Sequence, residues 1–173
     1  MAYRTVELGP RTEDIETDMF RIVSGFKGQI ADTSLFWEAA FLYGEDSRTT
    51  QLGGELSSAA LIAAINDPDP ATAFNPFGNQ ANSAAQLARV RNDLLTLAES
   101  RLMSVDAKVG GDLVDLPAGP LGFAVGYAYT EERFENVPDA AQQRGDTVGF
   151  NSSQPLYGSR DINSAFTEFG IPV

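Results

Sequence analysis

The chain contains neither cysteine nor histidine in its 173 residues. Without these two residue types it cannot form a disulfide framework, a thiolate zinc site, a Ser-His-Asp triad or a Cys-His catalytic pair. Any catalysis would depend on carboxylate, Lys, Tyr or Ser side chains. The two absences therefore exclude most of the common catalytic and structural-metal classes.

Basic residues are scarce as well. The chain has 12 Lys and Arg against 24 Asp and Glu, which gives a formal net charge of −12. Because an acidic surface repels nucleic acid phosphates, we expect no nucleic-acid partner. The hydrophobic fraction of 43% is nevertheless too high for a wholly disordered acidic chain. Part of the chain is therefore expected to bury apolar surface.

Long apolar runs are also missing. No stretch reaches the roughly 18 consecutive apolar residues of a membrane-spanning helix, and the first residues carry no secretory signal pattern. The mean hydropathy of −0.16 remains compatible with a membrane β-barrel, because apolar and polar residues alternate along the strands of such a barrel.

What the sequence does contain is alternation with a period of two, which indicates strands with two different faces. The strictest example runs from Leu121 to Tyr129, where large residues alternate with Gly and Ala. On this pattern we predict strands over residues 19–27, 35–44, 102–109, 121–129 and 162–173.

The predicted connections alternate between short and long. Short turns lie at residues 31–34 and 116–120, and long polar connections run from about 45 to 99 and from about 133 to 159. Helical spacing predicts one helix over residues 55–65 and a second one that Asn82 or Ser83 caps and that runs to Leu95. We therefore predict an all-β fold, an antiparallel up-and-down meander with one or two short helices in a long outer loop.

Neighbouring carboxylates suggest acid–base catalysis or calcium binding. The pairs are Glu45-Asp46, Asp67 with Asp69, and Glu131-Glu132. Adjacent acids on a strand point to opposite faces, and the run from Asp67 to Pro70 lacks the glycine and the terminal Glu of a calcium loop. We interpret the pairs as solvated charge. We predict no catalytic, cofactor-binding or metal-binding residue, no cofactor and no enzyme activity.

One segment resembles a known family. The run Asp115–Tyr129, which reads DLPAGPLGFAVGYAY, resembles a segment common in the barrels of TonB-dependent outer-membrane receptors. Further pieces with a likeness to that family follow in the expected order: FWEAAFLY at 36–43, FNPFG at 74–78, SVDAK at 104–108, GSRD at 158–161 and FTEFGIPV at 166–173. Together these pieces extend over nearly the whole chain.

The resemblance implies a partial receptor barrel over residues 1–173, with about six strands of a large transmembrane β-barrel and without the plug domain. The intact protein would lie in the outer membrane of a Gram-negative bacterium and take up a siderophore, cobalamin or an oligosaccharide. Its partners would be outer-membrane lipid, the remainder of the barrel and the plug, and the TonB complex only through that plug. The two long connections would contribute to the vestibule that gathers the ligand.

The resemblance and the alternation together assign two sets of facing residues. The residues expected to face lipid are Phe20, Ile22, Trp37, Phe41, Val105, Val109, Phe123 and Val125. Those expected to face the lumen are Arg21, Lys27, Glu38, Asp106 and Lys108.

A stand-alone soluble β-sandwich is the main alternative. In that interpretation the chain is a carbohydrate-binding module, and Trp37 and nearby tyrosines stack on sugar rings. It predicts two sheets that pack their apolar faces together. For the barrel piece, by contrast, we expect a chain that aggregates in plain buffer, because an open sheet leaves an apolar face and two strand edges exposed.

Overall fold

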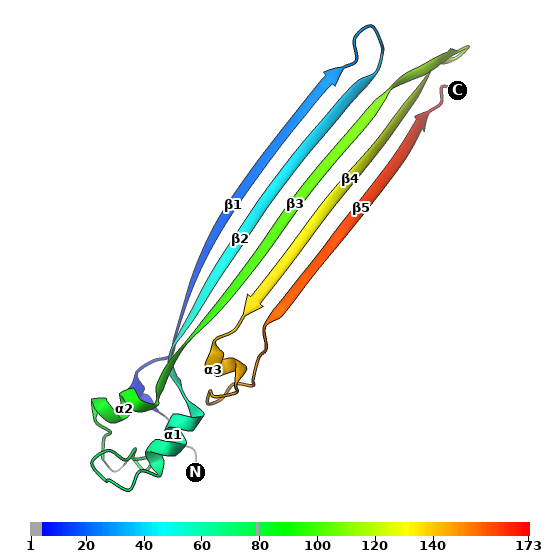
Figure 1. Ribbon diagram of the computed structural model, residues 1–173. Helices are drawn as coiled ribbons and strands as arrows, with labels where there is room; N and C mark the ends of the chain where they lie inside the picture. Colours follow the sequence, from blue (N-terminus) through cyan, green and yellow to red (C-terminus); the bar gives the residue numbers. More distant parts are fainter. Residues whose placement is uncertain (1–4, 79) are drawn as a thin grey trace. The chain divides into compact units, whose positions relative to one another are not determined.

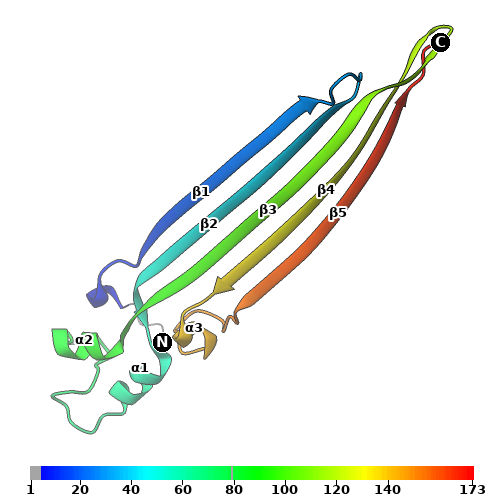
Figure 2. The ribbon, with the colours of Figure 1, turned by 45° about the horizontal axis from the view of Figure 1, so that its top comes forward.

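The computed structural model describes residues 5–78 and 80–173. Within them the chain forms five strands, which are β1 (Thr12–Gln29), β2 (Phe36–Leu56), β3 (Arg91–Leu116), β4 (Gly119–Val137) and β5 (Leu156–Gly170). The strands pair in chain order in a single antiparallel open sheet (Figures 1 and 2). The prediction of an all-β antiparallel meander is confirmed.

Each predicted strand lies largely within an observed one, but the predicted boundaries are wrong. β2 continues to Leu56 and β3 begins at Arg91, so the first long connection is shorter than residues 45–99. Likewise β4 continues to Val137 and β5 begins at Leu156, so the second long connection is shorter than residues 133–159. These extensions carry polar residues on both faces, which removes the alternation signal. The described residues form five strands rather than about six, and β5 ends at Gly170, before Pro172.

The two short turns are confirmed. Between β1 and β2, the Thr33 amide donates to the Ile30 carbonyl over 3.1 Å, and Asp32 takes a left-handed conformation with φ of 60°. Between β3 and β4, Gly119 has a φ of 135°, a region that side chains disfavour and glycine tolerates.

Within the described residues three short helices lie in the long connections, and Figure 1 shows where they follow the strands. Helices α1 (Ser58–Ile65) and α2 (Ala84–Val90) follow β2, and α3 (Ala140–Gln143) follows β4. A single 3-10 turn, η1, spans Val6–Leu8. Ser83 caps α2, as predicted. Its hydroxyl accepts from the backbone amide of Gln86, and the side-chain oxygen of Gln86 accepts from the backbone amide of Ser83. The prediction that this helix reaches Leu95 is wrong, since the chain enters β3 at Arg91, and α3 was not predicted.

The chain divides into two compact units. The connection unit consists of residues 5–17, 48–98 and 135–156, and the sheet unit consists of residues 18–47, 99–134 and 157–173. All buried hydrophobic side chains in the described residues belong to the connection unit; they are Leu56, Ala64, Phe74, Val90, Leu94 and Ala141. The described sheet unit therefore has no apolar core of its own.

Polar contacts join the separate segments of the connection unit. The Asp146 carboxylate accepts from the Ser57 hydroxyl over 2.8 Å and from the Ala59 amide over 2.8 Å. The Val148 amide donates to the Leu56 carbonyl over 2.9 Å, and the Val148 side chain packs against the core cluster. The β4–β5 connection is thus attached to the beginning of α1, so that the two long connections form one packed body.

Glu55 is a buried charge in this unit. Its side chain is 3% exposed, and its nearest cation is Arg11, whose Nη2 lies 3.2 Å from Oε2. Burial raises the pKa of the Glu55 carboxyl, although Arg11 opposes the shift. A raised pKa means that the group favours folding while it is protonated and loses this contribution as the pH rises through the raised value.

We expect Glu55→Gln to stabilise the connection unit at pH 7, because a neutral amide avoids the desolvation of the charged form. Near pH 4 the carboxyl is largely protonated in both states, so the difference should become small. Amide hydrogen exchange across α1 at the two pH values measures the effect. Faster exchange in the variant at pH 7 would mean instead that the Arg11 ion pair outweighs the burial.

Candidate functional site

The two faces of the sheet unit are fixed by contacts between neighbouring strands. On the first face, here called face A, the Lys108 ammonium lies 2.9 Å from the Glu38 carboxylate. The Ser104 and Thr130 hydroxyls lie 3.0 Å apart on the same face. Because side chains alternate along a strand, face A carries the even-numbered residues of β2, β3, β4 and β5 and the odd-numbered residues of β1. Face B carries the remaining side chains.

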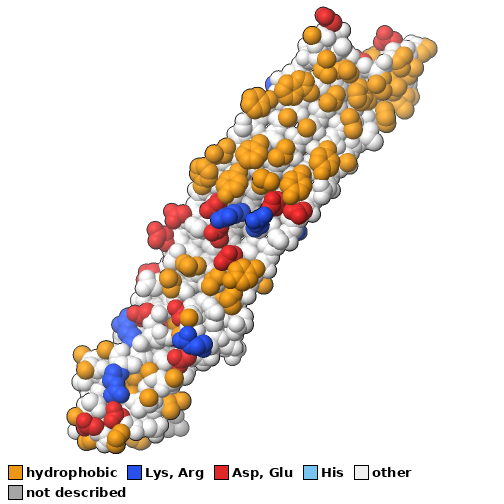
Figure 3. All heavy atoms as spheres, in the orientation of Figure 1, with side chains coloured by type: hydrophobic (Ala, Val, Ile, Leu, Met, Phe, Trp, Pro, Cys, Tyr) orange, Lys and Arg blue, Asp and Glu red, His pale blue; other side chains and the backbone are white. Residues whose placement is uncertain are grey.

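Face B carries a mostly apolar band, which also includes the neutral polar side chains of Ser24, Asn163 and Thr167. Over five stretches, one on each strand, face B has no charged side chain; these stretches are Phe20–Gly28, Trp37–Tyr43, Met103–Val109, Leu121–Tyr129 and Asn163–Phe169. Figure 3 shows hydrophobic side chains covering one face of the upper strands, down to a group of Arg, Asp and Glu side chains. We refer to these five stretches as the band stretches.

The residues expected to face lipid all lie on face B. They are Phe20, Ile22, Trp37, Phe41, Val105, Val109, Phe123 and Val125. Six of them are exposed, from Trp37 at 37% to Phe20 at 55%, and Val109 and Phe123 are half-buried by neighbours on the sheet. The structure thus brings the eight together on one surface. That this surface meets lipid stays a prediction.

The residues expected to face the lumen all lie on face A. Arg21 lies beside Gly44 of β2, Glu38 pairs with Lys108, and Lys27 and Asp106 share the face by alternation. Glu168 on β5 adds a charge that the prediction did not include. Over the band stretches face A therefore carries six charged side chains and face B none.

Face A also shows why small residues alternate with large ones on β4. A Cβ atom at Gly126 would clash with the ring of Phe166 on β5 and lie 3.1 Å from Lys108 on β3. The glycine therefore leaves room for an aromatic ring that crosses from the next strand, a pairing that protects strand glycines.

A row of charged and tyrosine side chains bounds the apolar band on face B. The Arg101 guanidinium contacts Glu99 and lies 3.4 Å from the Glu45 carboxylate, which accepts from the Tyr43 hydroxyl over 2.6 Å. On β4 and β5, Arg133 pairs with Glu131, and the Tyr129 hydroxyl donates to Asp161 over 3.1 Å. The sequence places aromatic residues, Tyr43 and Tyr129 among them, near the strand ends as an interface girdle, but it does not predict the ion pairs of this row, because the predicted strands end near the last apolar residue.

In the described residues, side chains of the carboxylate pairs are held in ion pairs and hydrogen bonds. Glu131 pairs with Arg133 on face B, whereas Glu132 pairs with Arg160 on face A, as their alternation predicts. Asp67 accepts from the Asp69 amide, from Arg89 and from Thr72, and these hydrogen bonds, led by the one from Asp69, lower the pKa of its carboxyl. Across residues 5–78 and 80–173, His, Cys, Asp and Glu side chains form no group of three or more that could hold a metal ion.

No helix in the described residues is both long enough and apolar enough to cross a membrane. Comparison with protein-family models, with curated proteins and with solved structures finds no match to this chain.

Proposed function

We propose that the chain forms part of the wall of a transmembrane β-barrel, in an outer-membrane receptor of the TonB-dependent type that takes up a large, scarce ligand. The observation that carries the proposal is the charge asymmetry of the sheet, with six charged side chains on face A and none on face B over the band stretches. A barrel strand in a membrane has this pattern because one face meets hydrocarbon and the other meets water.

The length of the apolar band supports the proposal. On β4 the band runs for nine residues, from Leu121 to Tyr129. A tilted transmembrane strand needs about 9–11 residues. Tyrosines at the end of the band, followed by ion-paired side chains, match the aromatic girdle at a membrane–water interface.

The missing core gives independent support. The apolar side chains of face B contact no second layer in the described residues, and leaving them in water is unfavourable by about 25 cal/mol per Å². The outer edges of β1 and β5 also carry unpaired backbone groups, which a membrane does not tolerate. Lipid on face B and further barrel strands at both edges would satisfy these requirements together.

By the resemblance, the ligand would be a siderophore, cobalamin or an oligosaccharide, and energy would reach the receptor through TonB and the plug. The wall would perform no chemistry, so we propose no enzyme activity and no cofactor. The connection unit would contribute to the outer vestibule.

The soluble β-sandwich has weaker support. Its two packed sheets would bury the apolar face of each sheet against the other. The described residues form one sheet, and Trp37 lies in the apolar band, beside Gly28 of β1. We therefore retain the barrel wall as the proposed function.

The one tryptophan of the chain, Trp37, tests the proposal directly. In lipid vesicles its emission should shift to the blue and be quenched by lipids that carry bromine on their acyl chains. In plain buffer we expect aggregation by sedimentation, and in detergent micelles a soluble chain with β circular dichroism. A monomer with cooperative β structure in buffer, unaffected by brominated lipid, would refute the barrel wall and favour a self-contained module.

The absence of cysteine allows a matched test of the two faces. Val125→Cys places a thiol on face B and Ala124→Cys places one on face A, one residue apart on β4. A fluorophore on residue 125 should be quenched by a lipid-confined quencher, and one on residue 124 by a water-soluble quencher. Equal quenching at both positions would contradict the assignment of face B to lipid.

A further inference from the structure

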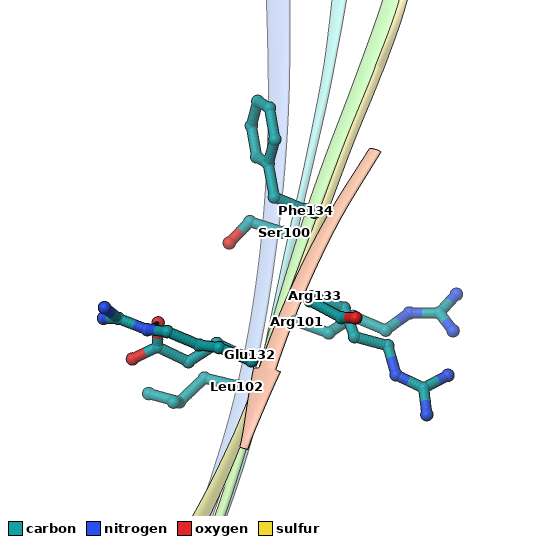
Figure 4. A pocket seen from close by; sticks show the side chains of 9 residues that line it. Ser100, Arg101, Leu102, Glu132, Arg133 and Phe134 are labelled. Carbon is teal, nitrogen blue, oxygen red and sulfur yellow. Dashed lines mark hydrogen bonds and ion pairs between the residues drawn. The ribbon is translucent and has the colours of Figure 1, made fainter. Parts of the chain in front are cut away.

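A cavity of about 470 Å³ opens between β3, β4 and β5 of the sheet unit. Its volume lies in the usual range for small-molecule sites. Figure 4 shows Ser100, Leu102, Glu132 and Phe134 projecting to one side of the strands, while Arg101 and Arg133 project to the other. The cavity therefore belongs to face A, which the proposed function leaves in contact with water.

A fixed pair of opposite charges lies in this cavity. Arg160 of β5 donates through Nε to Oε2 of Glu132 on β4 over 2.6 Å. This bond uses one nitrogen of the guanidinium and one oxygen of the carboxylate. The two Nη groups of Arg160 and Oε1 of Glu132 have no bond to another described residue, and the Arg160 side chain is 68% exposed. The pair thus offers a free cationic edge beside a free anionic oxygen.

Apolar surface and open space complete the cavity. Leu102 and Phe134, from the two neighbouring strands, present exposed side chains at 37% and 44%. At Gly158 on β5 an added Cβ atom would meet nothing within 4 Å. The glycine therefore leaves unfilled space next to the ion pair.

We propose that this cavity binds a small zwitterion with an apolar side chain, of the chemical class of an amino acid or a short peptide. The ligand carboxylate would accept from the Nη groups of Arg160, and the ligand ammonium would donate to Oε1 of Glu132. Its side chain would cover Leu102 and Phe134. A simple anion or cation fits less well, because each would lie beside a like charge of the Glu132–Arg160 pair.

The probe for this inference is L-phenylalanine, titrated into the full chain in a non-ionic polyoxyethylene detergent and followed by saturation-transfer NMR. Since the cavity is open, we expect a dissociation constant on the order of 1 mM. Phenylacetate lacks the ammonium and phenethylamine lacks the carboxylate, so each should bind at least about tenfold more weakly. Equal binding of either analogue, or no binding of L-phenylalanine, would overturn the proposal.

Variants locate the binding. Arg160→Gln and Glu132→Gln should each weaken L-phenylalanine binding at least about tenfold, and Gly158→Leu should abolish it by filling the cavity. Arg21→Gln, which removes a guanidinium from face A on β1, should leave binding unchanged. Circular dichroism confirms that each variant keeps its β structure. A Gly158→Leu chain that keeps its structure and still binds, or an equal loss in Arg21→Gln, would place the ligand elsewhere.

The proposed function and this inference fail separately. If brominated lipid does not quench Trp37 but L-phenylalanine still binds, the barrel wall is refuted and the cavity site stands. Quenching without binding would refute the cavity site alone.

Discussion

Val125→Arg is expected to lower the free energy of unfolding in lipid vesicles by about 2–4 kcal/mol, the cost of a basic residue near the bilayer midplane on the lipid face of a barrel. That corresponds to a roughly 30- to 700-fold change in the folding equilibrium. Val125 lies in the middle of the Leu121–Tyr129 stretch on face B, where no charged side chain is present to pair with the new guanidinium. Denaturant titration followed by Trp37 fluorescence measures the change.

The preceding residue provides the control for this substitution. Ala124 lies on face A of the same strand, so Ala124→Arg introduces the same side chain at the same depth on the side that the proposal assigns to water. It should change the unfolding free energy by less than about 1 kcal/mol, the usual range of exposed charge interactions. Similar destabilisation by both variants would mean that the loss comes from strand propensity or packing, and would contradict a lipid-facing face B.

The strands and their faces were predictable because they depend on a local pattern. Alternation over Leu121–Tyr129 or Met103–Val109 assigns every side chain to one of two faces, and Lys108 meets Glu38 across the sheet as that assignment requires. The cap of α2 was likewise predictable, since Ser83 and Gln86 have the spacing of a capping box.

The strand ends and the connection unit were not predictable from such local patterns. Beyond Tyr43, β2 carries polar residues on both faces as far as Gln51, so its period of two no longer separates apolar from polar positions. The burial of Glu55 and the bond from Ser57 to Asp146 join residues that lie far apart in the sequence. The ion pair in the cavity has the same origin, since Glu132 and Arg160 lie on separate strands and only the register of β4 and β5 brings them together.

Asp146→Ala is expected to release the β4–β5 connection from α1. The Asp146 carboxylate accepts from the Ser57 hydroxyl and from the Ala59 amide, and these bonds lower the pKa of the carboxyl, led by the bond from Ala59. A lowered pKa means that the stabilisation is present above the ordinary Asp value near pH 4 and is lost as the pH falls through the lower, folded value. At pH 7 the variant should destabilise the connection unit by about 1–2 kcal/mol, as the loss of a helix cap does.

Hydrogen exchange distinguishes this local release from general unfolding. The amides of Ala59 and Val148 should exchange about 5- to 30-fold faster in Asp146→Ala at pH 7, which corresponds to 1–2 kcal/mol, while amides of β3 between Met103 and Val109 should be unaffected. The parent chain should approach the behaviour of the variant as the pH falls below about 4, because protonation removes the same charged acceptor. Asp14→Ala removes an acid of the connection unit whose carboxylate makes no hydrogen bond or ion pair to another described residue, so it controls for the loss of charge. If Asp14→Ala accelerates exchange as much, or if Val148 stays protected in Asp146→Ala, the two long connections are held together by the apolar contacts of Val148 rather than by Asp146.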